Sequence, residues 1–212
     1  MARNPSSSDP AARESAPVSP ESIVSEGVVT VSDPPWAFAL FNTTRFAWLW
    51  LIIRVYVGWQ WLTSGWGKFN NPAWWSGDAL AGFWGRAVEI PADGRPAITY
   101  DWYRSFIQFM LDNQWYSWFG KVILLGELAI GLALIVGALV GIAAFFGGFL
   151  NWNFIMAGTA SSNGLLFALA IALMLAWKVA GWYGLDRYLL PLLGTPWERT
   201  PRRSQAATAP TV

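Results

Sequence analysis

The amino-acid sequence predicts an all-α integral membrane protein, a four-helix bundle with an extracytoplasmic aromatic segment at the interface between spans one and two. Three observations lead to this prediction. Only 13% of the 212 residues are charged, against ~25% in soluble domains. Apolar stretches long enough to cross a bilayer, which takes ~20 residues, recur along the chain. Glycines and single polar residues interrupt these stretches, as in helices that pack together inside a membrane.

The chain divides into a membrane domain flanked by two tails. Residues 1–35 are rich in Pro and Ser and lack helical periodicity, so we expect a disordered N-terminal tail. Residues 36–193 form the membrane domain. Residues 194–212 turn polar and basic, and we expect a disordered C-terminal tail.

The first span is expected at about residues 46–66, followed by Lys68. Five residues recur at intervals of four, three, four and three, which places them on one helix face: Arg54, Gly58, Trp61, Gly65 and Lys68. An arginine within a span costs at least ~3 kcal/mol unless it meets a partner or water, so Arg54 is expected to point into the bundle. The alternative is that Arg54 and Lys68 extend to opposite membrane surfaces and set the orientation.

Residues 70–119 are too polar and too rich in Pro and Gly to cross a bilayer, yet they hold many aromatic residues. We interpret residues 72–90 and 99–119 as amphipathic helices at the membrane interface, where Trp and Tyr are favoured. Three aromatic residues of the second piece share one face: Trp102, Phe106 and Phe109. Two roles are open for this segment, a lid over a site between the spans or anchoring at the interface.

Three further spans follow the aromatic segment. Residues 120–160 are apolar over about twice the length of one crossing, which predicts helices at about 120–139 and 142–160 with a turn near Gly137 to Gly141. The fourth span is expected at about 163–185. Short, uncharged connections make these helices antiparallel neighbours. Several glycines are expected to provide close-packing faces: Gly126, Gly131, Gly137, Gly147 and Gly148.

Charged residues and residue usage limit the location and the chemistry. Four arginines follow the last span and predict a cytoplasmic C-terminus: Arg187, Arg199, Arg202 and Arg203. With four spans, both termini lie in the cytoplasm of a bacterial or archaeal cell, and the protein is multi-pass in its cytoplasmic membrane. The net charge of +1 argues against nucleic acid as a partner. The absence of Cys and His excludes disulfides, cysteine-ligated iron–sulfur clusters, histidine-ligated haem and the usual zinc or copper sites.

A small set of polar residues within the spans is predicted to be buried: Arg54, Glu127, Asn151, Asn153 and Lys178. Glu127 and Arg54 are the candidate catalytic residues. The candidate substrate-binding residues are Lys68, Trp61, Trp66 and Asn151. A rise of ~1.5 Å per residue separates Arg54 from Glu127 by ~9 Å along the bundle, and Lys68 could approach Glu127 from the other side. The alternative role for the set is a structural ion pair with interhelical asparagine hydrogen bonds.

An ordered set of motifs runs through all four predicted spans. It comprises Arg54-x3-Gly58, Gly65-x2-Lys68, Gly126-Glu127 with Gly131, Asn151-x-Asn153 before Ala157-Gly158, and the closing Tyr183-Gly184-Leu185-Asp186-Arg187. This set resembles the DoxX family of four-helix membrane proteins, particularly its DoxD branch, the membrane subunit of thiosulfate:quinone oxidoreductase. The resemblance covers about residues 45–193. One departure is the turn between spans two and three, which lacks the polar or basic residue often seen in the family.

The resemblance implies a subunit that oxidises thiosulfate to tetrathionate and passes electrons to membrane quinone, a diffusible acceptor. Tryptophans beside Arg54 and Lys68 could stack on the quinone ring, with Glu127 as a proton acceptor. No covalently bound or metal-ligated cofactor is expected, so electrons pass directly to quinone or through a second oxidoreductase subunit. Expected partners are membrane lipid and quinone, and a homo-oligomer is compatible with the sequence. The alternatives are a non-enzymatic scaffold that docks a soluble oxidoreductase and, third, a small-solute transporter.

Overall fold

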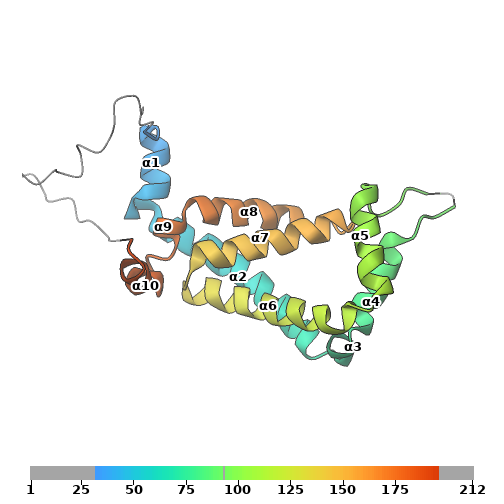
Figure 1. Cartoon of the computed structure of the whole chain (residues 1–212). Helices are drawn as coiled ribbons and strands as arrows, with labels where there is room; N and C mark the ends of the chain where they lie inside the picture. The colour runs from blue at the N-terminus through green and yellow to red at the C-terminus, as the bar shows by residue number, and fades with distance from the viewer. Residues whose placement is uncertain (1–31, 93, 196–212) are drawn as a thin grey trace, which may run out of the picture. The chain divides into compact units, whose positions relative to one another are not determined.

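The computed structural model describes residues 32–92 and 94–195, and within them every regular element is a helix. The predicted tails lie almost wholly outside the described residues. The elements, labelled in Figure 1, are α1 (Pro35–Asn42), η2 (Thr44–Phe46), α2 (Ala47–Phe69), α3 (Pro72–Ser76), α4 (Asp78–Val88), α5 (Asp101–Asp112), α6 (Tyr116–Val136), α7 (Val140–Met156), α8 (Asn163–Leu175), α9 (Trp177–Ala180) and α10 (Asp186–Leu192). The prediction of an all-α fold is confirmed for this part of the chain.

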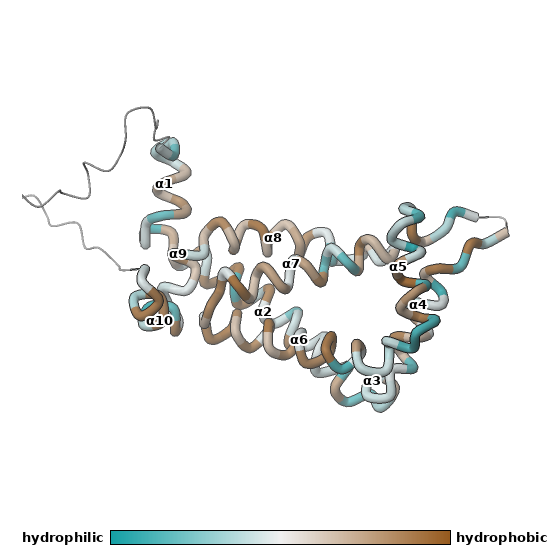
Figure 2. The backbone as a smooth tube through the Cα atoms, in the orientation of Figure 1, coloured by the Kyte–Doolittle hydropathy of each residue, from teal (hydrophilic) through white to brown (hydrophobic). Residues whose placement is uncertain are grey.

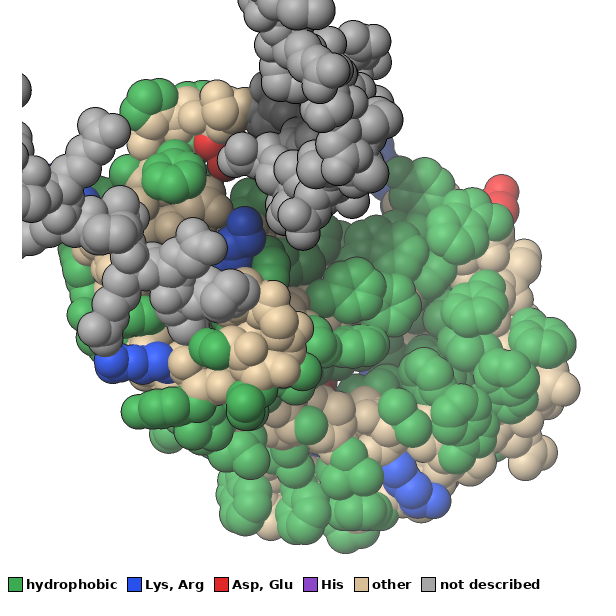
Figure 3. All heavy atoms as spheres, turned by 60° about the vertical axis from the view of Figure 1, so that its left-hand side comes forward, with side chains coloured by type: hydrophobic (Ala, Val, Ile, Leu, Met, Phe, Trp, Pro, Cys, Tyr) green, Lys and Arg blue, Asp and Glu red, His purple; other side chains and the backbone are tan. Residues whose placement is uncertain are grey.

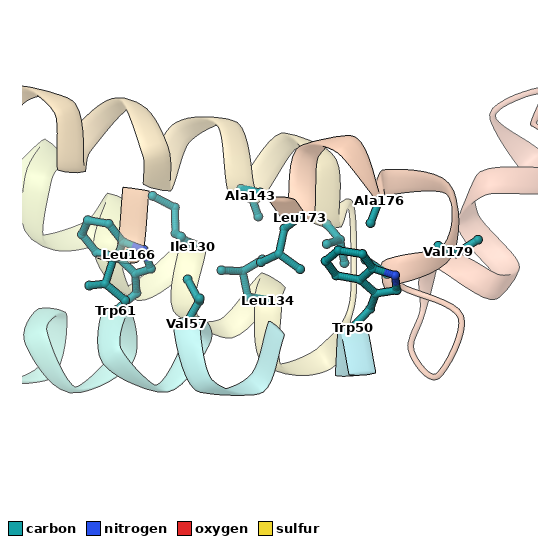
Figure 4. Close-up of a cluster of buried hydrophobic side chains, with 13 residues drawn as sticks. Trp50, Val57, Trp61, Ile130, Leu134, Ala143, Leu166, Leu173, Ala176 and Val179 are labelled. Carbon is teal, nitrogen blue, oxygen red and sulfur yellow. The ribbon is translucent and has the colours of Figure 1, made fainter. Parts of the chain in front are cut away.

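Four helices, α2, α6, α7 and α8, lie side by side as a bundle, with α2 against α6 and α7 against α8 (Figure 1). Further contacts of α6 with α7 and of α2 with α8 complete the ring. Hydrophobic residues dominate these four helices (Figure 2). Their core includes Trp50 and Val57 of α2, Leu134 of α6 and Leu173 of α8 (Figure 4). The shorter helices α4 and α5 pack on each other at one end of the bundle, and α1, α9 and α10 lie at the other (Figure 1).

The predicted inward face of α2 is confirmed, since Arg54, Gly58, Trp61 and Gly65 are all buried. This face meets α6 closely, because a Cβ atom added to Gly131 would lie 2.6 Å from the backbone nitrogen of Leu62. The role predicted for Gly126 is wrong. An added Cβ there meets no described atom within 4 Å, so that glycine faces away from the neighbouring helices.

The predicted aromatic segment is helical, with breaks that sequence periodicity did not indicate. Gly77 has a φ of 94°, a left-handed conformation that separates α3 from α4. In α5 the buried side chains are Tyr103, Ile107 and Met110, whereas the predicted aromatic face stays exposed: Trp102, Phe106 and Phe109. Helix α5 therefore presents two apolar faces, one to the protein and one outward.

The second and third predicted spans correspond to α6 and α7, and the turn between them is Gly137–Leu139. Gly137 takes a φ of 72°, as glycine does most readily at the end of a helix. Helix α6 begins at Tyr116, four residues before the predicted start of that span.

The fourth predicted span, residues 163–185, is not one continuous helix. Helix α8 ends at Leu175, the chain bends at Ala176, and α9 continues for one turn. The bend lets Trp177 pack against Gly141, and Val179 and Ala180 enter the core. Apolar composition alone does not distinguish a continuous helix from one that is broken by a bend at the end of the bundle.

The bend also corrects the prediction that Lys178 is buried. Its side chain is exposed, and its Nζ lies 3.4 Å from Oδ1 of Asn42, which belongs to α1.

One helix of the described chain, Tyr116–Val136, is long and apolar enough to cross a membrane by itself. The pair Pro35–Asn42 and Thr44–Phe69 meets the same criterion together, with a bend of 62° between its parts. The other two bundle helices are apolar but shorter, at 17 residues for Val140–Met156 and 13 for Asn163–Leu175.

Candidate functional site

The bundle contains two buried charged centres, one near each end. The first is formed by Arg54 of α2, whose guanidinium points at the last turn of α6. Its Nη1 donates to the carbonyl oxygens of Leu134 at 2.6 Å and Ile135 at 2.9 Å, and its Nη2 donates to that of Tyr183 at 3.1 Å. Helix C-terminal carbonyls lack partners within their own helix, so Arg54 provides donors to the end of α6.

Asp186 stabilises the other side of the same turn. Its carboxylate accepts hydrogen bonds from the backbone N–H groups of Leu139 and Val140, at the start of α7. Burial raises the pKa of the Asp186 carboxyl, while these two amides and the charge of Arg54 oppose that effect. Arg54 and Asp186 together therefore hold the α6–α7 turn. The sequence placed Asp186 in the closing motif but not among the candidate site residues, although an acidic residue two positions after Gly184 and directly after an apolar stretch is a signal for a turn-binding carboxylate.

The second centre joins α2 to α6 through Lys68 and Glu127. Lys68 Nζ lies 2.7 Å from Glu127 Oε2, and it donates to the hydroxyl of Ser64, also at 2.7 Å. The side chain of Glu127 is fully buried and that of Lys68 is 17% exposed. The aromatic ring of Trp74, in α3, lies 5.0 Å from Lys68 Nζ. The ammonium is thus held between a carboxylate, a hydroxyl and a ring.

The structure brings Lys68, not Arg54, to Glu127. Arg54 binds α6 seven and eight residues further along the helix, which is ~10 Å or more from Glu127. The second carboxylate oxygen of Glu127, Oε1, is buried and has no hydrogen-bond partner among residues 32–92 and 94–195.

A polar cavity of about 350 Å³ adjoins the Lys68–Glu127 pair. Ser64, which accepts the hydrogen bond from Lys68, is part of its wall. Helices α2, α7 and α8 and the turn before α8 supply the rest: Gln60, Trp61, Thr63, Asn151, Phe154, Ser162, Asn163 and Leu166. The sequence shows Gln60, Thr63 and Ser64 as polar residues within an apolar span, but it does not show that they meet Asn151 across a cavity.

Two buried side chains of this wall have polar atoms without a hydrogen-bond partner in the described structure. Asn151 is 0% exposed, and neither its amide nitrogen nor its amide oxygen has a partner there. Trp61 is 3% exposed, and its indole N–H is unpaired as well. A buried donor or acceptor without a partner is destabilising, so native proteins satisfy almost all of them. These atoms lie behind the surface of the cavity wall, as donors and acceptors that are not yet used by the described part of the protein.

The remaining candidate residues lie outside this site. Trp66 is 59% exposed and stacks on Phe69 with ring centroids 5.7 Å apart, so its ring faces away from the cavity. Asn153 lies on another face of α7, where its side-chain oxygen accepts a hydrogen bond from the Tyr103 hydroxyl at 3.1 Å. Within the described residues, no cluster of acidic side chains has the arrangement of a metal site.

Comparisons with known proteins do not assign this site to a family. No protein-family model, no curated protein and no solved structure matches the chain. The site is therefore defined by its own contacts, burial and charge.

Proposed function

We propose that this chain is a four-helix protein of the cytoplasmic membrane, similar to the DoxX family, with α2, α6, α7 and α8 as its spans. The outward surface of the bundle supports this proposal, because large apolar side chains are exposed on all four helices: Ile52, Trp59, Val122, Leu132, Phe145, Phe149, Leu165 and Leu175. Few charged side chains interrupt the hydrophobic surface in Figure 3. Soluble monomers rarely expose contiguous apolar patches beyond a few hundred Å², and lipid would cover this one.

We further propose that the protein is the membrane subunit of a thiosulfate:quinone oxidoreductase. The observation that carries the proposal is the polar cavity, where unpaired Trp61 and Asn151 atoms lie inside an otherwise apolar bundle beside the Lys68–Glu127 pair. Buried polar groups without a partner are destabilising, and polar residues within a membrane span are by default candidates for a function.

The cavity suits a small oxyanion. Accessible amide and hydroxyl groups of its wall can donate hydrogen bonds, and none of the side chains that line it in the described structure carries a carboxylate. The ammonium group of Lys68 is near the cavity, because it donates a hydrogen bond to the hydroxyl of Ser64 in the cavity wall. Two thiosulfate dianions would join through a new S–S bond to give one tetrathionate dianion and release two electrons. One quinone would take these electrons with two protons and become quinol.

In this mechanism the chain positions substrate and exchanges protons, and the electrons pass to quinone directly or through a partner subunit. Lys68 attracts the dianion and stabilises the carboxylate of Glu127. Glu127 is the proton-exchanging group, since Lys68 links its carboxylate to Ser64 of the cavity wall and its oxygen Oε1 has no partner in the described structure. Arg54 has no part in this chemistry and serves the fold.

A scaffold that docks a soluble oxidoreductase is the second candidate. The exposed aromatic face of α5, formed by Trp102, Phe106 and Phe109, favours it as a contact surface beyond the bundle.

The test is anaerobic quinone reduction by the purified chain in lipid nanodiscs with thiosulfate as donor. We expect the native chain to reduce quinone and Glu127→Gln to lose at least ten-fold in rate. Glu89→Gln, the same change at an exposed position at the end of α4, is the matched control and should keep the native rate. A folded native chain that reduces no quinone at saturating thiosulfate contradicts direct electron transfer from thiosulfate to quinone on this chain, and the scaffold becomes the better account.

A further inference from the structure

A second cavity lies beneath the α4–α5 end of the molecule, and the proposed function does not use it. Its volume is about 130 Å³, and α4, α5, α6 and α7 all contribute to its wall. Most of the wall is apolar, with aromatic rings from Phe83, Trp84, Phe106, Phe119, Phe149 and Phe154. An apolar cavity of about 150 Å³ in another protein stays dry and binds benzene, so this one has the volume for a single ring.

Three residues with hydrogen-bonding groups, Tyr103, Asn153 and Trp84, interrupt the apolar wall. Tyr103 lines the cavity, and its hydroxyl donates to Asn153, whose Oδ1 lies at 3.1 Å and whose carbonyl oxygen lies at 3.2 Å. Burial raises the pKa of Tyr103 to about 12, so its hydroxyl stays neutral at physiological pH. Because its only proton is used by Asn153, the Tyr103 oxygen is left as an acceptor for a ligand hydroxyl.

The cavity has an outward side and an inward side. Phe106 and Phe149 are about half exposed, so a ligand can enter between α5 and α7. On the inward side, Phe154 belongs to the walls of both this cavity and the polar one. Phe154 is thus common to the wall of an apolar cavity and that of a polar cavity.

We propose that the cavity under α4 and α5 binds one neutral six-membered ring that carries a hydroxyl, a phenol-type molecule, with that hydroxyl donating to Tyr103. The ring packs among the aromatic side chains, and any substituent opposite the hydroxyl extends outward past Phe106 and Phe149. This inference is independent of the proposed function, because ring binding requires no thiosulfate and no electron transfer.

The test is ¹⁹F NMR of the full chain in detergent micelles with 4-fluorophenol, fluorobenzene and empty micelles as the baseline. We expect a bound resonance for 4-fluorophenol and weaker binding of fluorobenzene. Tyr103→Phe should lower the affinity for 4-fluorophenol about five-fold, which corresponds to one hydrogen bond, and leave that for fluorobenzene unchanged.

A variant that fills the cavity tests the location. Ala157 is buried in the cavity wall, so Ala157→Leu should abolish binding of both ligands. Ala168→Leu, the same change at an exposed position on α8, is the control and should bind as the native chain does. If Ala157→Leu does not fold, the Tyr103→Phe comparison still decides the inference. Equal binding to native, Tyr103→Phe and empty micelles would overturn it, since the ligands would then only partition into detergent.

Discussion

The two charged centres of the bundle differ in what they leave unpaired. At the Arg54 end, three carbonyl oxygens and two backbone amides engage the guanidinium and the Asp186 carboxylate, and Nε of Arg54 is the one side-chain atom of this pair left without a partner in the described chain. At the Lys68 end, one oxygen of Glu127, the indole N–H of Trp61 and the whole amide of Asn151 have no partner in the described chain. The first centre ties helix ends together, whereas the second keeps polar groups available beside a cavity.

This difference shows that burial and charge do not by themselves identify a site inside a bundle. Arg54 is 1% exposed, nearly as buried as the candidate residues Glu127 and Asn151 at 0%, yet its two Nη groups donate only to backbone carbonyl oxygens. The Lys68 end differs from the Arg54 end because its unpaired polar atoms lie beside a cavity.

The largest expected effect is the loss of the Arg54 centre. Arg54→Met removes three hydrogen bonds to carbonyl oxygens and leaves Asp186 without a nearby cation, which we expect to destabilise the fold by ~3–5 kcal/mol. Thermal unfolding in detergent, followed by circular dichroism, measures this change. Arg86→Met, at an exposed position of α4, should shift stability by no more than ~0.5 kcal/mol. A native-like midpoint for Arg54→Met would refute the structural role.

The close approach of α2 and α6, which places Lys68 beside Glu127, gives a smaller effect. Gly131→Ala puts a methyl group 2.6 Å from the backbone of Leu62, and separating the two helices should cost ~1–3 kcal/mol. Gly126→Ala, five residues earlier on the same helix, meets open space and should stabilise α6 by up to ~1 kcal/mol. Unfolding of the two variants under one condition checks the contrast, and a destabilised Gly126→Ala would contradict the described packing.

The smallest expected effect concerns Tyr103, whose pKa rises from 10.0 to about 12 because burial disfavours the phenolate. The folded state therefore retains a proton that the unfolded chain releases above pH 10, so this contribution to stability is complete below pH 10 and is lost as the pH rises toward 12. Unfolding midpoints between pH 9 and 12 should fall less steeply for Tyr103→Phe than for the native chain. Parallel pH profiles would show that Tyr103 is accessible to solvent.

Sequence periodicity predicted those features that depend on one helix at a time. The inward face of α2, from Arg54 to Gly65, follows from residue spacing, and so does the turn at Gly137. Features that depend on the meeting of distant segments were not predictable in this way. The bend at Ala176 places Trp177 against Gly141. The role of Asp186 depends on its hydrogen bonds with Leu139 and Val140, which lie 47 and 46 positions earlier in the sequence.

The same limit applies to the site. Lys68, Glu127, Trp61 and Asn151 were predictable as polar or aromatic residues within spans, because such residues are unfavourable in lipid. Their partners were not. Helix length placed Arg54 and Lys68 as alternative cations for Glu127, and only the packed structure assigns Lys68 to it.

The most direct test of the contrast between the two ends is a paired measurement of stability and activity on Asn151→Leu. Leucine has a similar size and removes two buried, unpaired polar atoms, so we predict a variant at least as stable as the native chain, by up to ~1–3 kcal/mol. We also predict that thiosulfate-dependent quinone reduction in nanodiscs falls at least ten-fold in the same preparation. A variant that is destabilised, or one that reduces quinone at the native rate, would contradict the assignment of the Lys68 end as the working end of the bundle.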